Sequence, residues 1–314
     1  MKLGQTTVAV RQIQKQGYRA QDSNGGRLTL HQACSEGNTT VVNALLTAGA
    51  KVTARGIRGR TPLYTASLNG RKEVVHLLLE RGADFTTSNS YGVTPVRAAS
   101  GDGHLEVVKL LIDKGADITA ADNDGWTPLN SASDSGHLEV VKLLIDKEAD
   151  ITAANNNGFT PLNSAANRGH FEVVKLLIDK GADITAASND GWTPLYLATY
   201  RGHVEVVKLL IDKGADITVA NNDGWTPVNS ASVGGHLEVV KLLIDKGADI
   251  TAASNDGWTP LNSASDEGHL EVVKLLIDKG ADITAANNDG LTPLNSASLQ
   301  GHSEVVKLLI NKGR

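Results

Sequence analysis

The pair Thr-Pro returns along this chain at a constant step of 33 residues. It stands at Thr61, Thr94, Thr127, Thr160, Thr193, Thr226, Thr259 and Thr292. The surrounding residues return with it, since 123–147 and 255–279 differ only where Ser135 is replaced by Glu267. A fixed period of about 20–50 residues is typical of repeat architectures, in which each unit supplies the core of the next. We therefore expect a stack of similar units rather than one compact domain.

The first part of each copy predicts a short helix. Thr127 is placed to cap the N-terminus of a helix that begins at Pro128, where the missing N–H has no partner to lose. The residues LNSAS that follow are small and allow close packing against neighbouring helices. The pair Gly136-His137 then breaks the chain.

The second part of each copy predicts a longer helix and a turn. In LEVVKLLIDK an apolar stripe recurs at helical spacing, at Leu138, Val141, Leu144 and Ile145. Lys142 lies three residues after Glu139, on the expected solvent face. A glycine usually follows the helix, as at Gly115, Gly181, Gly214, Gly247 and Gly280. The segment ADITAANNDG then predicts an extended turn with Asn, Asp and Gly at its tip.

Two helices and a projecting turn at period 33 resemble the ankyrin repeat family. The family signature T-P-L-H-x-A appears as TPLYTA, TPVRAA, TPLNSA, TPLYLA and TPVNSA, and LTLHQA at 28–33 marks a degenerate earlier copy. The resemblance implies an all-α ankyrin-repeat solenoid of stacked helix-turn-helix units with projecting β-hairpin turns. The expected boundaries are a partial N-terminal cap at 1–27 and nine copies at 28–58, 59–91, 92–124, 125–157, 158–190, 191–223, 224–256, 257–289 and 290–314.

Three departures from the family pattern matter. The signature histidine, which bonds between repeats in the family, survives only as His31, and later copies have Asn, Tyr or Arg. Glu148 replaces the glycine after one second helix, and a left-handed conformation there should cost about 1 kcal/mol. The last copy keeps its apolar stripe with only Ser303 and Asn311 added, so we expect a longer chain or a partner over that face.

Composition limits the class of partner. Residues 1–60 carry nine Lys and Arg against two Asp and Glu, whereas the remainder carries 21 against 33. An acidic array disfavours nucleic acid, which needs clustered basic residues. One cysteine, no secretory signal and no long apolar run predict an intracellular, cytoplasmic protein without membrane insertion.

The chain shows no pattern typical of an active site, and we expect no enzyme, cofactor or metal. Histidines in register cannot converge on one ion, so each is expected to cap or orient its own helix. The Asn-Asp-Gly tips lack the remaining ligands of a calcium loop. Cys34 lies one helical turn after His31, but it occupies the small buried slot of the first helix and has no third group to orient it. The histidines in register are His104, His137, His170, His203, His236, His269 and His302.

The copies differ most in the turn and the first helix. In the ankyrin family these slots lie at the fingertips and along the inner helix, facing the groove that contacts other proteins. Tyr, Trp and Arg, which carry most interface energy, gather here. The expected partner-binding residues are Trp126, Phe159, Trp192, Trp225, Trp258, Asp124, Asp190, Asp223, Asp256, Asn130, Tyr196, Tyr200, Arg168, Arg201, Asp134 and Glu267. Alternatively, each Trp stacks on the next finger and stiffens it.

The sequence favours a non-catalytic module that binds another protein, for which an acidic groove predicts a basic segment. Two alternatives stay open. The array could be a structural spacer, or the targeting part of a longer enzyme, receptor or effector. The oligomeric state is open.

Overall fold

The computed structural model describes residues 20–21 and 27–313. The chain divides into two compact units, Met1–Asn156 and Asn157–Arg314, which are described separately. The expected N-terminal cap at 1–27 falls almost entirely outside the described residues. Only the strand β1 (Ala20–Gln21), paired antiparallel with β2 (Arg27–Leu28), is described there.

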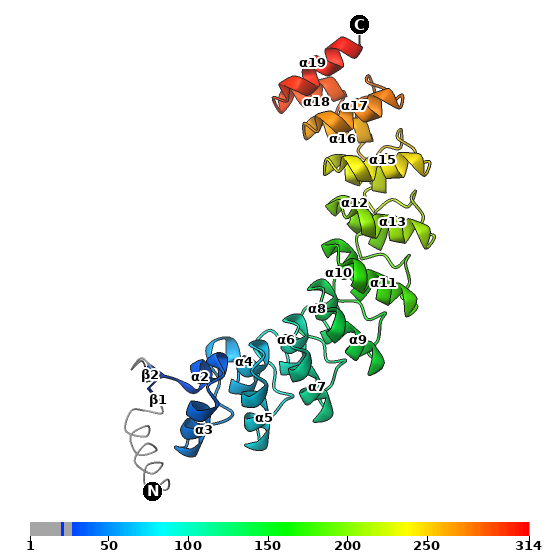
Figure 1. Cartoon of the computed structure of the whole chain (residues 1–314). Coiled ribbons are helices and arrows are strands. Elements are labelled where there is room, and N and C mark those ends of the chain that lie inside the picture. The colour runs from blue at the N-terminus through cyan, green and yellow to red at the C-terminus, as the bar shows by residue number, and fades with distance from the viewer. Residues whose placement is uncertain (1–19, 22–26, 314) are drawn as a thin grey trace. The chain divides into compact units, whose positions relative to one another are not determined.

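In the first unit, pairs of helices follow one another in chain order, with the first helices packed in one row and the second helices in another (Figure 1). A single turn of 3-10 helix, η1 (Ile57–Gly59), stands in one connection. The helices are α2 (Leu30–Glu36), α3 (Thr39–Thr47), α4 (Pro62–Leu68), α5 (Lys72–Glu80), α6 (Pro95–Gly101), α7 (Leu105–Asp113), α8 (Pro128–Asp134) and α9 (Leu138–Asp146).

The second unit repeats this arrangement. First helices pack on first helices and second helices on second helices throughout the unit. Its helices are α10 (Pro161–Arg168), α11 (Phe171–Asp179), α12 (Pro194–Arg201), α13 (Val204–Asp212), α14 (Pro227–Val233), α15 (Leu237–Asp245), α16 (Pro260–Asp266), α17 (Leu270–Asp278), α18 (Pro293–Leu299) and α19 (Ser303–Lys312). The all-α repeat prediction is confirmed.

A threonine cap and a proline mark the N-terminus of the first helix at each Thr-Pro pair. The Thr127 side chain accepts the backbone N–H of Asn130, and Pro128 occupies the first helical position, as predicted. The same cap recurs at every described Thr-Pro pair. Small buried residues such as Ala132 and Ser133 then allow the close approach of neighbouring first helices.

The buried stripe of the second helices is shifted from the one that the sequence predicts. In α9, Val140 is buried together with Val141 and Leu144, whereas Leu138 and Ile145 are only half-buried. The stripe is displaced because α9 packs against both α8 and α7, so two sides of the helix are covered. On the opposite face the Lys142 ammonium lies 2.7 Å from the Glu139 carboxylate, an exposed pair that adds little stability.

The chain leaves the second helices α3 to α17 in the left-handed region, whereas Gly313 after α19 has φ of −88°. Gly181 has φ of +91° and Glu148, the one departure from glycine, has φ of +64°. The predicted left-handed conformation of Glu148 is therefore confirmed.

A projecting turn, which we call the finger, follows each second helix. In the second unit the 183–192 finger is closed by a hydrogen bond from the Ser188 N–H to the Trp192 carbonyl. The N–H and the side-chain amide of Asn222, in the following finger, donate to the carbonyls of Asp190 and Asn189. Within residues 29–313 the fingers are turns without strand residues. They are joined tip to tip by these hydrogen bonds.

Candidate interaction face

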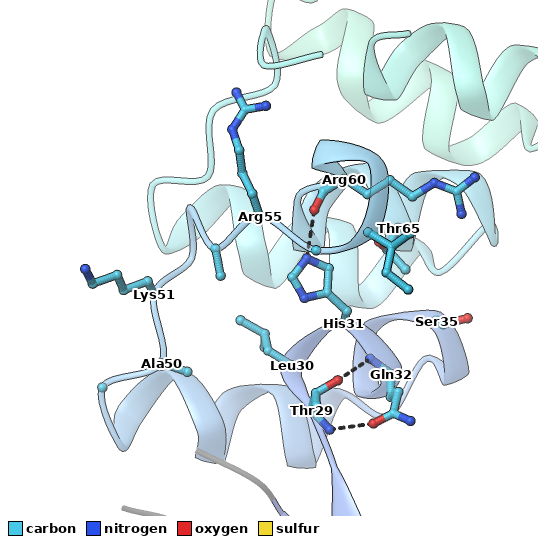
Figure 2. Close-up of a pocket in the computed structure, with 14 residues that line it drawn as sticks. Thr29, Leu30, His31, Gln32, Ser35, Ala50, Lys51, Arg55, Arg60 and Thr65 are labelled. Atoms are coloured by element: carbon cyan, nitrogen blue, oxygen red, sulfur yellow. Dashed lines mark hydrogen bonds between the residues drawn. The ribbon is translucent and has the colours of Figure 1, made fainter. Parts of the chain in front are cut away.

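In four copies a buried asparagine amide of the first helix, at Asn130, Asn163, Asn229 or Asn262, holds the finger that follows in the chain. The Asn163 side chain donates to the carbonyls of Ala186 and Trp192, at 3.0 and 3.2 Å. His31 makes the equivalent bond, with Nε2 donating to the Arg60 carbonyl at 2.8 Å (Figure 2). Both bonds join residues 29 apart in the chain. Asparagine thus replaces the missing histidine of the signature and preserves the bond between copies.

This role changes the expectation for Asn130. It is fully buried, and its amide donates to the Ala153 carbonyl at 3.0 Å. It also completes the cap with Thr127. Asn130 therefore has no surface to offer a partner, because the finger that it supports covers it.

The histidines in register bridge copies, which corrects the expectation that each serves its own helix. Nε2 of His203 lies 3.1 Å from the Asn167 carbonyl at the end of the preceding first helix. Burial lowers the pKa of His203 and so favours its neutral form. The ring also leaves no space beside Gly169, where an added Cβ would meet Nδ1 at 2.5 Å. The equivalent bonds belong to His104, His236, His269 and His302.

Carboxylates stand at the finger tips. Asp124, Asp190, Asp223 and Asp256 are all exposed. Their backbone carbonyls accept the N–H of the next finger, so the main chain is fixed while the side chain meets solvent. The tips therefore present a row of negative charges.

The predicted aromatic residues are half-buried, each lying between a finger and a first helix. They are Trp126, Phe159, Trp192, Trp225 and Trp258. Trp192 stacks on Tyr196 of α12, with ring centroids 6.1 Å apart and an interplanar angle of 18°. Phe159 meets the same indole edge to face at 6.2 Å. Trp192 therefore stacks on the first helix of its own copy, and its contact with Phe159 of the preceding finger is edge to face rather than flat.

One hollow in the second unit gathers much of the predicted set. It has a volume of about 430 Å³ and lies between α12, α14, α16 and three successive fingers. It brings together Trp192, Tyr196, Tyr200, Asp223, Trp225, Trp258 and Glu267 from the prediction. It also takes in Asn221, Ser230, Val233, Ser263 and Asp266, which the site prediction lacked. Asn221, Ser230 and Ser263 vary little between copies, so variation could not reveal them.

The remaining predicted residues do not line this hollow. Trp126, Asp124 and Asp134 belong to the first unit, and Phe159, Arg168, Asp190, Arg201 and Asp256 lie elsewhere in the second. Arg201 is already engaged, with its guanidinium 5.3 Å from the centre of the Tyr200 ring and its Nε 3.2 Å from Asn167 Oδ1.

The hollow carries uncompensated negative charge. Asp223, Asp266 and Glu267 make no ion pair within the part of the chain that the structure describes. Among the described residues, the Asp266 carboxylate accepts a hydrogen bond only from the neutral Gln300 amide, at 3.3 Å. By contrast, several glutamates on the second helices are paired with lysines, as Glu238 is with Lys241 at 2.9 Å. Burial raises the pKa of Tyr196 to about 12, so this hydroxyl stays neutral.

A larger hollow of about 1070 Å³ lies in the first unit, around His31 (Figure 2). The charged side chains of Lys51, Arg55 and Arg60 extend away from the imidazole in Figure 2. The His31 ring is occupied by its bond to the Arg60 carbonyl. This hollow therefore lacks convergent polar groups, and the hollow of the second unit is the better candidate site.

Catalytic and metal chemistry find little support. Burial raises the pKa of the Cys34 thiol to about 12, so the nucleophilic thiolate is scarce at neutral pH. Among the described residues there is no group of three or more His, Cys, Asp or Glu that could hold a metal ion. No helix in this described portion is long and apolar enough to cross a membrane.

Comparison with known families identifies the repeat. A family model described as ankyrin repeats (3 copies) matches residues 2–89, 86–155, 152–221, 181–254, 216–287 and 253–314. Together these overlapping segments span nearly the whole chain. A comparison with curated proteins finds no match.

Proposed function

The chain belongs to the ankyrin repeat family, whose repeats generally mediate protein–protein interaction, and on that premise we propose that its fingertips and first helices bind a partner protein. The module does no chemistry of its own. The binding region consists of the copies at 191–223, 224–256 and 257–289, which form the hollow of the second unit.

The observation that carries this proposal is the hollow itself. Large aromatic side chains are left half-exposed beside carboxylates that have no ion-pair partner among the described residues, whereas the second-helix glutamates of the same copies, Glu205, Glu238 and Glu271, are paired with lysines. Neither the half-exposed aromatic side chains nor the unpaired carboxylates contribute to a hydrophobic core. An interface uses aromatic anchors and complementary charge. The single buried cysteine fits a reducing, intracellular setting for this interaction.

The test compares two matched variants in capture from lysate of the source organism. The first changes Trp126, Trp192, Trp225 and Trp258 to Ala. The second changes an exposed glutamate of the second helix to Ala in each of the same four copies, at Glu139, Glu205, Glu238 and Glu271. Captured proteins are identified by mass spectrometry, purified and titrated against each variant by calorimetry.

A purified partner should bind wild type and the glutamate variant alike and should lose most of its affinity for the tryptophan variant. Circular dichroism and a thermal melt check that the tryptophan variant is folded. If all three proteins bind the partner equally, the fingertips are not the binding face.

Tip-to-tip hydrogen bonds favour a second candidate, a structural spacer. They fix the distance between neighbouring fingers, as at Asn222 and Asn189. A spacer captures no partner through the tryptophans, so the same experiment separates the two functions. A targeting role within a longer protein would use the same binding face.

A further inference from the structure

The hollow of the second unit adjoins a copy that lacks the buried amide. In copies with asparagine, the side chain reaches the next finger, as Asn229 does to the Trp258 carbonyl at 2.9 Å. The copy at 191–223 has Tyr196 in this slot, and its ring stacks on Trp192 instead. Tyr64 and Arg97 fill this slot in the first unit, whereas Tyr196 is the one departure from asparagine in the second unit. Such local departures are expected at functional or strained positions.

The walls of this hollow are aromatic. Indoles of three successive fingers, Trp192, Trp225 and Trp258, face it together with the phenol rings of Tyr196 and Tyr200 from α12. The volume of about 430 Å³ is within the range of sites that enclose a small ligand, about 300–1000 Å³. A side chain of a partner fits there with part of its flanking backbone.

The rim of the hollow carries three carboxylates that make no ion pair with a described residue. Asp223 stands on a finger, and Asp266 and Glu267 stand at the end of α16. Covering these carboxylates with a neutral group would remove water from charges that have no partner, which is unfavourable. The Arg201 guanidinium, which follows Tyr200 in α12, is held on the Tyr200 ring and by Asn167. The occupant must therefore bring its own positive charge.

Among cationic side chains, arginine fits best. Its guanidinium is planar, stacks on aromatic faces and donates in pairs to carboxylates, and it loses hydration more readily than the lysine ammonium. Aromatic faces and carboxylates are the two groups that this hollow offers. We propose that the hollow binds an arginine side chain of the partner protein, an inference that rests on the proposed function.

The test uses fluorotryptophan-labelled protein and fluorine NMR. Three of the four tryptophans line the hollow, and Trp126 lies in the first unit as an internal reference. The probes are the N-acetyl methylamides of arginine, of its uncharged isostere citrulline, and of lysine, each titrated into the millimolar range. Single Trp→Phe variants assign the resonances.

The arginine probe should shift the resonances of Trp192, Trp225 and Trp258 in a saturable way and leave that of Trp126 unchanged. Citrulline should bind at least about tenfold more weakly, which corresponds to about 1.4 kcal/mol, and lysine should lie between the two. Equal shifts with citrulline, or no saturable shift with arginine, would overturn the proposal.

A charge variant adds a second readout. The triple change Asp223→Asn, Asp266→Asn and Glu267→Gln should abolish the preference for arginine over citrulline. A matched triple variant on the second helices, Glu205→Gln, Glu238→Gln and Glu271→Gln, has the same net charge and should keep the preference. If both variants keep it, the rim carboxylates do not select the ligand and the proposal is wrong.

These outcomes are distinct from failure of the proposed function. If the arginine probe is silent while a purified partner still needs the tryptophans, the arginine inference fails and the interaction face stands. If the probe binds but no partner depends on this face, the proposed function fails and the arginine site remains.

Discussion

The buried amide of Asn163 should be a larger source of stability than its place in a short polar helix suggests. Its side chain donates to the Ala186 and Trp192 carbonyls and accepts from the backbone and hydroxyl of Thr160. The change Asn163→Ala removes all of these bonds at a site without solvent. The Trp192 carbonyl keeps its bond from Ser188, whereas the Ala186 carbonyl has no second donor among the described residues.

The magnitude follows from the bonds that are lost. A buried neutral hydrogen bond contributes about 1 kcal/mol, and an orphaned buried group costs about 1–3 kcal/mol. We therefore expect Asn163→Ala to lower the free energy of unfolding by roughly 2–3 kcal/mol. Asn163→His should recover part of this loss, because His31 makes the same bond to the next finger.

Asn295 provides the matched control. It occupies the same slot in α18, is exposed, and bonds within its own copy to Thr292. Asn295→Ala should cost less than about 1 kcal/mol. Urea unfolding followed by circular dichroism measures all three variants. If Asn163→Ala and Asn295→Ala are equally destabilising, the bridge between copies does not stabilise the array.

Three further outcomes follow from the backbone and from titrating groups. Glu148→Gly should stabilise the protein by roughly 1 kcal/mol and raise the melting temperature by about 2–4 °C, because Glu148 has φ of +64°. Gly115→Glu should lower the melting temperature for the same reason. An unchanged melting temperature in either variant would contradict the backbone strain. The Cys34 thiol should resist a thiol reagent at mildly alkaline pH until urea unfolds the chain, because burial raises its pKa to about 12; fast reaction of the folded protein would contradict its burial. Hydrogen bonds from Thr185 hold the pKa of Asp183 below its usual range, so this contribution is full above about pH 4 and is lost as pH falls through the folded pKa. The urea concentration at the midpoint of unfolding should therefore decrease when the pH is lowered below about 4. The decrease should be smaller in the Thr185→Val variant, and an equal decrease in both proteins would contradict the role of Thr185.

Features set by neighbours in sequence were predictable. The cap at Thr127, the start at Pro128 and the left-handed Glu148 depend on the conformation of a few adjacent residues, and the structure has them where the sequence predicts them. The buried stripe was predicted in part, because coverage of Val140 depends on a helix of the preceding copy.

Features that depend on residues distant in the sequence were not predictable. The His203 imidazole meets a carbonyl 36 residues earlier, so its sequence neighbours pointed to the wrong helix. Asn130 was predicted at the surface, because a polar residue gives no sign that the next finger will cover it. The aromatic slots were predicted, but the inclusion of Asp266 was not. It depends on the packing that brings the end of α16 beside α12 and the fingers.

The finger joints have a consequence for how the gene can change. Asn222 donates backward to Asn189 and Asp190, and its own carbonyl accepts from Asn255 in the following finger. The finger of each such copy thus presents the backbone carbonyls that accept hydrogen bonds from the asparagine of the next finger. An in-register crossover between two nearly identical coding stretches adds or deletes one whole copy and leaves no group unmatched. The number of copies can therefore change in a single recombination event without a compensating mutation, while substitutions such as Tyr196 diversify individual copies.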